Sequence, residues 1–316
     1  MAGDNSPPIL DAHAAGVARA AAVLQAGGLV AVPTETVYGL AARADRAEAV
    51  AAIYRAKGRP DFNPLIVHVL GVEDGAALAQ FDEQARLLAE AFWPGPLTLV
   101  LPRRGDAALA EAVTAGLPTV ALRSPAHPAM RALLAAAALP LAAPSANRSG
   151  AISPTSAAHV VASLGGRVDL ILDGGACSEG IESTILALRE EGGWQVLRPG
   201  PITEAQISAV VGASSAVMTS SGKIEAPGQL ASHYSPGKPV RLEATIASDD
   251  EFHIGFGPVA GDWNLSSRGD LAEAAARLYS ALHRAAESDR PNVAVAPIPD
   301  RGIGLAVNDR LRRATA

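Results

Sequence analysis

The length, composition and charge of this chain limit its class before any motif is considered. At 316 residues it exceeds what one hydrophobic core comfortably fills, so two domains are expected. Hydrophobic residues make up 49% of the chain, 18% are charged, and the net charge is −6 without a block of like charges. Proteins that grip nucleic-acid backbones usually carry a basic face, so this balance argues against such binding as the main role.

The cysteine content and the apolar runs exclude further classes. A single cysteine, Cys177, rules out an intramolecular disulfide framework and a cysteine-based zinc site. The first ten residues lack the basic and apolar segments of a secretory signal. The longest uncharged apolar run, residues 132–144, is interrupted by Pro140 and is too short to span a bilayer. We therefore expect a soluble, cytoplasmic protein without a membrane partner.

Predicted strands and helices alternate along the first two thirds of the chain. Apolar runs predict strands at residues 29–32, 65–70, 97–101, 119–122, 168–172, 185–188 and 194–197, the last two as a hairpin. Periodicity and capping signals predict helices at 11–25, 45–56, 74–92, 128–138, 153–164 and 203–211. In the fifth helix, Ser153 and Pro154 form the start signal. This order predicts an α/β fold with a twisted, mixed sheet and helical cover.

The composition changes after residue 211. Ser, Gly, Ala and Pro dominate residues 212–238, which predicts a linker. Beyond it, strands are predicted at 240–242, 252–256 and 293–298, and helices at 270–287 and 305–313. We therefore expect a first domain at 1–211, a linker at 212–238 and a small C-terminal α/β domain at 239–316.

Several predicted strands adjoin a short polar cluster. The clusters are Thr34-Glu35-Thr36, Arg123-Ser124, Ser145-Ala146-Asn147, Glu182-Ser183-Thr184 and Arg198. The α/β proteins commonly bind ligands at such strand ends. Arg123 and Arg198, together with Lys57 and Arg59, suit a ligand with several anionic oxygens. Any one arginine alone is better explained by pairing with a surface carboxylate, but clusters at five strand ends favour one anion-binding cleft.

Familiar nucleotide, metal and hydrolase motifs are missing from the sequence. It contains no GxxxxGK[ST], no GxGxxG between a strand and a helix, and no serine within GxSxG. The seven histidines show no metal-ligand spacing. The residues alone indicate an α/β enzyme with a polar, anion-binding cleft, and they go no further.

Seven short motifs, taken together, indicate a family. They are PTETVYGL, KGRPDFNPLIVH, FWPGPLT, PSAN, ESTI, LRPGP and HYSP. In this order and spacing they resemble the YrdC-like family of threonylcarbamoyl-AMP synthases in its longer, two-domain form. The resemblance covers nearly the whole chain, including Ala226-Pro227-Gly228 and the terminal RGIGLAVNDRLRRA, although HYSP replaces the commoner HYAP. It implies a catalytic first domain with a YrdC-like sheet and a Rossmann-like C-terminal domain.

The resemblance also implies a reaction. L-threonine, bicarbonate and ATP would give L-threonylcarbamoyl-AMP and pyrophosphate, which makes the protein a nucleotidyltransferase. A separate tRNA threonylcarbamoyl transferase complex would then use the product to form threonylcarbamoyladenosine in tRNA, with at most a weak tRNA contact by this chain. Mg²⁺ is expected to arrive with ATP, held by its phosphates and not by protein side chains. No organic cofactor is implied.

The family's functional residues can be carried over by motif. The implied threonine contacts are Thr34, His68, Arg123 and Ser183. The implied ATP contacts are Lys57, Arg59, Asn63, Thr119, Ser145, Asn147, Ser153, Arg198 and Tyr234. Among these, Lys57, Arg59, Ser145 and Asn147 are expected to be catalytic, by stabilising charge on the reacting phosphate. Because Tyr234 falls in the linker, we expect the linker to lie over the active site and gate it.

Two other functions fit parts of the same pattern. A double-stranded RNA binding module of the same fold is disfavoured by the negative charge and by the absence of interleaved aromatic residues. A carbamoyl-transfer module that uses carbamoyl phosphate, like related domains in hydrogenase maturation proteins, would need zinc-finger and acylphosphatase segments that the chain lacks.

Overall fold

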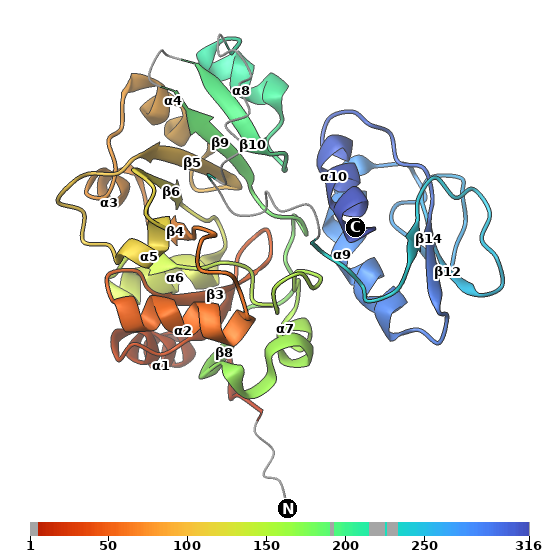
Figure 1. Ribbon diagram of the computed structural model, residues 1–316, viewed down its shortest axis with the longest axis horizontal. Coiled ribbons are helices and arrows are strands. Elements are labelled where there is room, and N and C mark those ends of the chain that lie inside the picture. Colours follow the sequence, from red (N-terminus) through yellow and green to blue (C-terminus); the bar gives the residue numbers. More distant parts are fainter. Residues whose placement is uncertain (1–5, 190–192, 215–224, 226–232, 316) are drawn as a thin grey trace, which may run out of the picture.

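The computed structural model consists of two parts, each built around its own sheet (Figure 1). It describes residues 6–189, 193–214, 225 and 233–315. The strands of the larger sheet, in order across it, are β1 (Ile9–Asp11), β8 (Leu170–Asp173), β2 (Val30–Pro33), β3 (Tyr38–Arg43), β7 (Leu141–Ala142), β4 (Ile66–His68), β6 (Thr119–Arg123), β5 (Leu97–Pro102), β9 (Thr184–Leu188) and β10 (Trp194–Arg198). Some adjacent strands in this sheet are parallel, such as β4 and β6, and others are antiparallel, such as β9 and β10, so the expected mixed sheet is confirmed.

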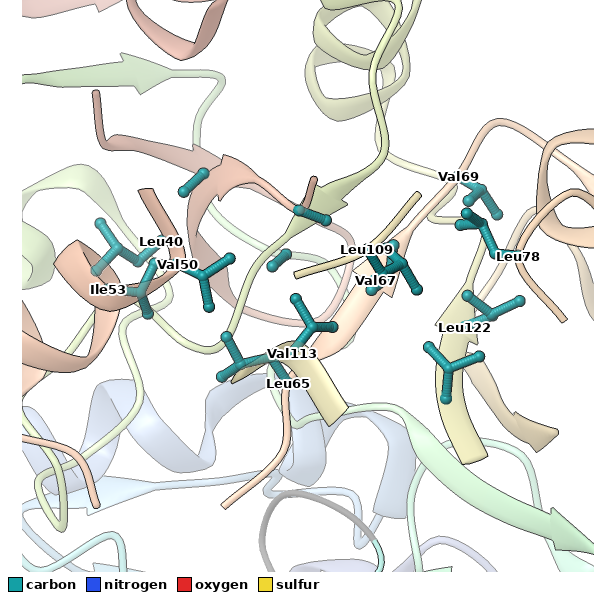
Figure 2. Packing of buried hydrophobic residues seen from close by; sticks show 14 of the residues in the cluster. Leu40, Val50, Ile53, Leu65, Val67, Val69, Leu78, Leu109, Val113 and Leu122 are labelled. Carbon is teal, nitrogen blue, oxygen red and sulfur yellow. The ribbon is translucent and has the colours of Figure 1, made fainter. Parts of the chain in front are cut away.

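Helices pack on both faces of this sheet because successive strand residues point to opposite sides. Val30 and Val32 of β2 join a core with α1 (Ala14–Gln25) and α6 (Pro128–Ala137). Ala31 joins the opposite core, where Val50 and Ile53 of α2 (Ala47–Lys57) pack near Leu40 (Figure 2). The other helices of this part are α3 (Val72–Ala76), α4 (Glu83–Phe92), α5 (Glu111–Thr114), α7 (Ala157–Leu164) and α8 (Glu204–Val211).

A third, smaller apolar cluster marks the face on which the site forms. It contains Ile66 of β4, Ala121 of β6 and Ile185 of β9, whereas their neighbours Val67, Leu122 and Leu186 belong to the main core. One face of β4, β6 and β9 therefore packs into the main core, whereas the other face carries only a few apolar side chains.

The second part is a small parallel α/β unit. Its sheet runs β11 (Val240–Arg241), β14 (Asn292–Val295), β12 (Glu251–Gly255) and β13 (Trp263–Asn264), and every neighbouring pair is parallel. Two helices, α9 (Leu271–Glu287) and α10 (Gly304–Ala314), lie on the side of this unit that faces the first part, with β12 and β14 beyond them (Figure 1). The expected small α/β domain is therefore present, and its helices form the contact with the larger part.

Several local signals are confirmed. Strands β9 and β10 form the predicted antiparallel hairpin. Helix α8 starts with a reciprocal capping box between Thr203 and Gln206. At the start of α9, the Asp270 carboxylate accepts the backbone N–H groups of Ala272 and Glu273.

Other local predictions are wrong for identifiable reasons. Asp11 belongs to β1, which pairs with β8, and not to a helix. The predicted helix 74–92 divides into α3 and α4, because the Asp82 carboxylate accepts the N–H of Ala85 and starts a new helix. The predicted helix start at Ser153 moves to Ser156, whose hydroxyl accepts the N–H of His159. Strands β1, β3, β7 and β13 and helix α5 were not predicted.

The expected domain boundaries at residues 211 and 239 stay predictions. Residues 215–224 and 226–232, including Ala226-Pro227-Gly228, lie outside the described residues. Among the residues that the structure does describe, no helix has the length and apolar character needed to cross a membrane.

Candidate active site

The strand directions of the larger sheet bring its polar clusters together. Strands β4 and β6 are parallel and end at His68 and Arg123, which lie opposite each other in the register. Strand β5 is antiparallel to β6 and parallel to β9, so the residue that precedes β9, Ser183, lies beside the end of β6. Because β10 runs antiparallel to β9, its last residue, Arg198, returns to the same place.

One pocket collects most of the predicted site residues. Eight of them line it: Thr34, Arg59, His68, Arg123, Ser145, Ser183, Arg198 and Tyr234. Gly39 and Ile66 also line it, so the pocket extends from the strand ends onto the face of the sheet. The cavity has a volume of about 50 Å³, far below the roughly 300–1,000 Å³ of typical small-molecule sites. This volume is too small for a ligand of nucleotide size.

Arg123 lines the pocket and is held from three sides. Its Nη2 donates to Glu35 Oε1 at 2.6 Å, its Nη1 to Thr36 Oγ1 at 2.9 Å, and its Nε to the carbonyl of Gly95 at 3.2 Å. Burial raises the pKa of Glu35, but the Arg123 guanidinium outweighs it and holds that pKa below the ordinary value. A fixed guanidinium with N–H groups to spare is suited to a carboxylate ligand.

His68 lies beside Arg123 as a buried, neutral imidazole. Burial and the neighbouring guanidinium lower its pKa to about 3. Its Nδ1 is buried and has no hydrogen-bond partner among the described residues. A buried nitrogen without a partner is unfavourable in the empty protein and gives a bound ligand a ready hydrogen-bond site.

Thr34 and Ser183 are partly engaged by their surroundings. The Thr34 hydroxyl donates to the carbonyl of Val37 at 2.7 Å and accepts that residue's N–H, which closes the turn after β2. The Ser183 hydroxyl lies 2.7 Å from Thr98 Oγ1 and accepts from Arg198 Nη2 at 3.1 Å. These bonds fix both hydroxyls at the wall of the pocket.

Lys57, Arg59 and Arg198 differ from Arg123 in their surroundings. Within the described part of the chain, no carboxylate oxygen lies within 4.0 Å of the charged nitrogens of Lys57, Arg59 or Arg198. Arg59 donates to the carbonyls of Asn63 and Pro64, and burial lowers its pKa to about 10. Such underpaired cations indicate a site that binds an anion.

Lys57 takes a supporting position next to the pocket. Its buried ammonium donates to the carbonyls of Ser145 at 2.5 Å and Asn147 at 2.6 Å. Burial, reinforced by Arg59, lowers its pKa well below the ordinary value. Gly58 then ends α2 in the left-handed conformation, which sends the chain towards Arg59.

Besides Lys57, four other predicted ATP contacts do not line the pocket. Asn147 is buried and its amide donates to the carbonyls of Arg148 and Ala151. Ser153 is buried and donates to Glu182 at 2.6 Å. Asn63 lies in the Arg59 loop, where its buried Oδ1 has no partner among the described residues. Thr119 begins β6, whereas Arg123 ends it. Their roles as ATP contacts remain predictions.

The predicted site left out four polar residues at the pocket. Glu35 and Thr36 were noted only as part of a polar cluster, yet both accept hydrogen bonds from Arg123. Glu182 and His233 line the pocket directly. The ESTI and HYSP motifs contain both residues, so the signal was present, but nothing in the sequence showed which partners they meet.

The acidic and imidazole groups do not gather around a common point. No group of three or more His, Cys, Asp or Glu side chains that could hold a metal ion occurs among the residues described. The buried thiol of Cys177 has a pKa raised to about 12 by burial and the nearby Glu35, so it is unsuited to act as a nucleophile.

Comparisons with known proteins identify the family of this chain. A family model for Sua5/YciO/YrdC, described as "Telomere recombination", matches residues 22–200, and one described as "Threonylcarbamoyl-AMP synthase, C-terminal domain" matches residues 202–316. Threonylcarbamoyl-AMP synthase of Bacillus subtilis is 41% identical over 94% of this chain and 92% of its own. The enzyme of that name from Pyrococcus abyssi is 40% identical over 94% of this chain and 93% of its own.

Solved structures add the same conclusion at the level of the fold. The crystal structure of P. abyssi Sua5 complexed with L-threonine matches with a TM-score of 0.89 and 36% identity, over 97% of both chains. The two-sheet α/β architecture is thus that of a known class of two-domain proteins. The chain belongs to the Sua5/YciO/YrdC family.

Proposed function

We propose that this protein is an L-threonylcarbamoyladenylate synthase, a nucleotidyltransferase that converts L-threonine, bicarbonate and ATP into L-threonylcarbamoyl-AMP and pyrophosphate. The nearly full-length similarity to threonylcarbamoyl-AMP synthases supports this activity. The observation that carries it is the single pocket in which all four predicted threonine contacts meet Arg59, Ser145 and Arg198. Double-stranded RNA binding as the main function is not favoured, because the near full-length relatives are enzymes.

Threonine would bind at the Arg123 end of the pocket. The guanidinium, fixed by Glu35 and Thr36, would take the carboxylate. The neutral His68, whose Nδ1 has no partner among the described residues, would accept a hydrogen bond from the ammonium or hydroxyl of threonine. P. abyssi Sua5, which matches this chain over its length, was solved complexed with L-threonine, which supports this substrate.

The chemistry would proceed in two steps. The threonine amine, once neutral, attacks the carbon of bicarbonate and forms a carbamate with loss of water. A carbamate oxygen then attacks the α-phosphorus of ATP, the bond from that phosphorus to the bridging oxygen breaks, and pyrophosphate leaves. Arg59 and Arg198 line the pocket, form no ion pair within the described ranges, and would stabilise the charge on the phosphate oxygens. No side chain has to form a covalent bond, so the protein acts by positioning and electrostatics.

Mg²⁺ would enter with ATP, bound by phosphate oxygens and water. The donor set around the pocket fits this arrangement, since its carboxylates Glu35 and Glu182 are both engaged by arginines. The ion would neutralise part of the triphosphate charge. The product would then pass to the tRNA threonylcarbamoyl transferase complex.

The pocket would have to widen before ATP binds. Tyr234 lines it, is 1% exposed, and adopts a φ of 67°, an unfavourable conformation for a residue with a side chain. Next to it, His233 donates its backbone N–H to the carbonyl of Arg313 on α10. These contacts support the proposal that residues 233–238, the described end of the linker, lie over the site and gate it. For residues 215–224 and 226–232, this expectation lies outside the described residues.

The decisive experiment measures pyrophosphate release by the purified full chain. We expect release only when threonine, bicarbonate and ATP are present together, with L-threonylcarbamoyl-AMP detected by mass spectrometry. Omitting each substrate in turn is the control. Release that does not depend on threonine, or a product without the carbamoyl group, would contradict the proposal.

A further inference from the structure

Glu182 connects the pocket to the second part of the molecule. It lies just before β9, lines the pocket and is 6% exposed. Its Oε1 accepts the hydroxyl of Ser153 at 2.6 Å. Its Oε2 accepts the Tyr279 hydroxyl at 2.8 Å and Arg310 Nε at 2.9 Å. Tyr279 lies on α9 and Arg310 on α10, so both of these partners come from the second part.

The side chain of Arg310 is completely buried, which is rare for an arginine. Its Nη1 donates to the carbonyl of Pro199 at 2.8 Å and to Asp309 Oδ2 at 2.9 Å. It therefore meets the first part at both Glu182 and the turn that directly follows Arg198. Burying a guanidinium is unfavourable unless it is paired and hydrogen-bonded, so the complete burial of Arg310 needs an explanation.

The charges around Glu182 suggest why Arg310 is buried beside it. Burial raises the pKa of Glu182, but Arg310 and then Arg198 outweigh it and lower that pKa to about 2, so the carboxylate is charged. Its field also acts on Lys57, a cation next to the pocket. Without Arg310, the nearest cations left to balance Glu182 would be those that an anionic ligand needs.

We propose that Arg310 is a positioning residue of the pocket: by pairing with Glu182, it keeps this carboxylate from neutralising Arg198. The second part of the molecule thereby sets the affinity of the pocket for the phosphate groups of the nucleotide. The inference rests on the proposed function for the identity of that ligand. A plain docking contact would also use this ion pair, but it would not make the pocket's affinity for anions depend on charge balance.

The test is a charge cycle read out by ligand binding. The full chain and its Arg310→Gln, Glu182→Gln and double variants are titrated calorimetrically with inorganic pyrophosphate and with Mg-ATP, without threonine. Arg310→Gln should weaken binding of both by roughly tenfold, the effect of one uncompensated charge nearby. The double variant should return to within about threefold of the parent, a coupling expected only for interacting groups. Arg312→Gln, an exposed arginine on the same helix, is the matched control and should bind normally.

The Glu182→Gln variant keeps the inference testable if Arg310→Gln does not fold. With Arg310 retained and the carboxylate removed, pyrophosphate should bind at least as tightly as to the parent. A plain docking contact predicts weaker binding for this variant and no recovery in the double variant, and either result would overturn the inference. Pyrophosphate release by the parent chain is measured in parallel. Its absence would contradict the proposed function, while the binding series still decides the role of Arg310.

Discussion

The arginines that line the pocket differ in the protein groups to which they donate hydrogen bonds. Arg123 donates to Glu35, Thr36 and the carbonyl of Gly95, so its guanidinium is held in the fixed position that the proposed carboxylate contact requires. Arg59 bonds to backbone carbonyls of its own loop. A cation held by carbonyls keeps its charge available, so Arg59 is the better candidate for charge that develops during the reaction.

Replacing Arg59 by alanine should therefore reduce turnover more than stability. We expect kcat/KM for pyrophosphate release to fall roughly a hundredfold or more, about 3 kcal/mol of transition-state stabilisation. The thermal midpoint should change little, because Arg59 has no ion pair among the described residues. Arg55→Ala, an exposed arginine one turn earlier on α2, is the control. Equal losses in both variants, or full turnover in Arg59→Ala, would refute this role.

The motifs located the residues that line the pocket, but not the contacts that connect the pocket to the second part of the molecule. Thr34, Arg123 and Ser183 were predictable, because polar residues at strand ends converge once the strands pair. Glu182 was not, because its partner Arg310 lies 128 residues further along the chain. Ser153 looked like a helix cap, since Pro154 follows it, but its hydroxyl satisfies Glu182. Pairings between parts distant in sequence leave no local signal.

The turn after β10 holds the pocket by close backbone approach. A Cβ on Gly200 would lie 2.3 Å from the backbone nitrogen of Thr184 and 2.8 Å from the carbonyl oxygen of Glu182. Backbone atoms cannot move aside as a flexible side chain can, so a side chain at this position must push β9 away from β10. Arg198 ends β10 two residues earlier and would shift with it.

Gly200→Ala should consequently impair folding stability and activity together. Overpacking of this kind costs about 1–3 kcal/mol of unfolding free energy, and a displaced Arg198 should lower the rate of pyrophosphate release. Urea denaturation and steady-state kinetics measure the two effects. Gly105→Ala serves as the control, because its Cβ would meet nothing within 4 Å. A Gly200→Ala protein with parental stability and turnover would show that the turn is more compliant than its contacts indicate.

Elements with strong local signals were predictable, and those defined by pairing were not. Helix α8 and helix α9 begin where Thr203 and Asp270 supply caps. Strand β1, with three residues, and strand β13, with two, exist because neighbouring strands complete their hydrogen bonds. A short segment carries too little periodicity to be distinguished from a loop.

The two parts of the molecule also meet through a pair of stacked imidazoles. His159 of α7 and His283 of α9 lie with ring centroids 3.8 Å apart and an interplanar angle of 18°. His283 contacts the carbonyl of Ser153 at 3.2 Å, and Glu287 is the nearby carboxylate on its own helix. Burial, together with the partner imidazole, lowers the pKa of His159 to about 4, and burial also lowers that of His283. The stack thus favours the neutral rings.

This stack should make the docked molecule sensitive to acid. A folded pKa below the unfolded value of about 6.5 means that the unfolded chain binds more protons between pH 6.5 and 4. The stabilisation is therefore complete above pH 6.5 and is lost as the pH falls towards 4. For His159 alone, the unfolding free energy should drop by about 1–2 kcal/mol between pH 7.5 and 5.

His159→Gln should lose correspondingly less unfolding free energy over this pH interval in urea denaturation, because glutamine does not titrate. His13→Gln, at an exposed histidine that stacks on no other ring among the described residues, controls for the change in histidine number. If His159→Gln loses as much stability as the parent, the acid sensitivity arises elsewhere, since only protonation of this stack distinguishes the two proteins.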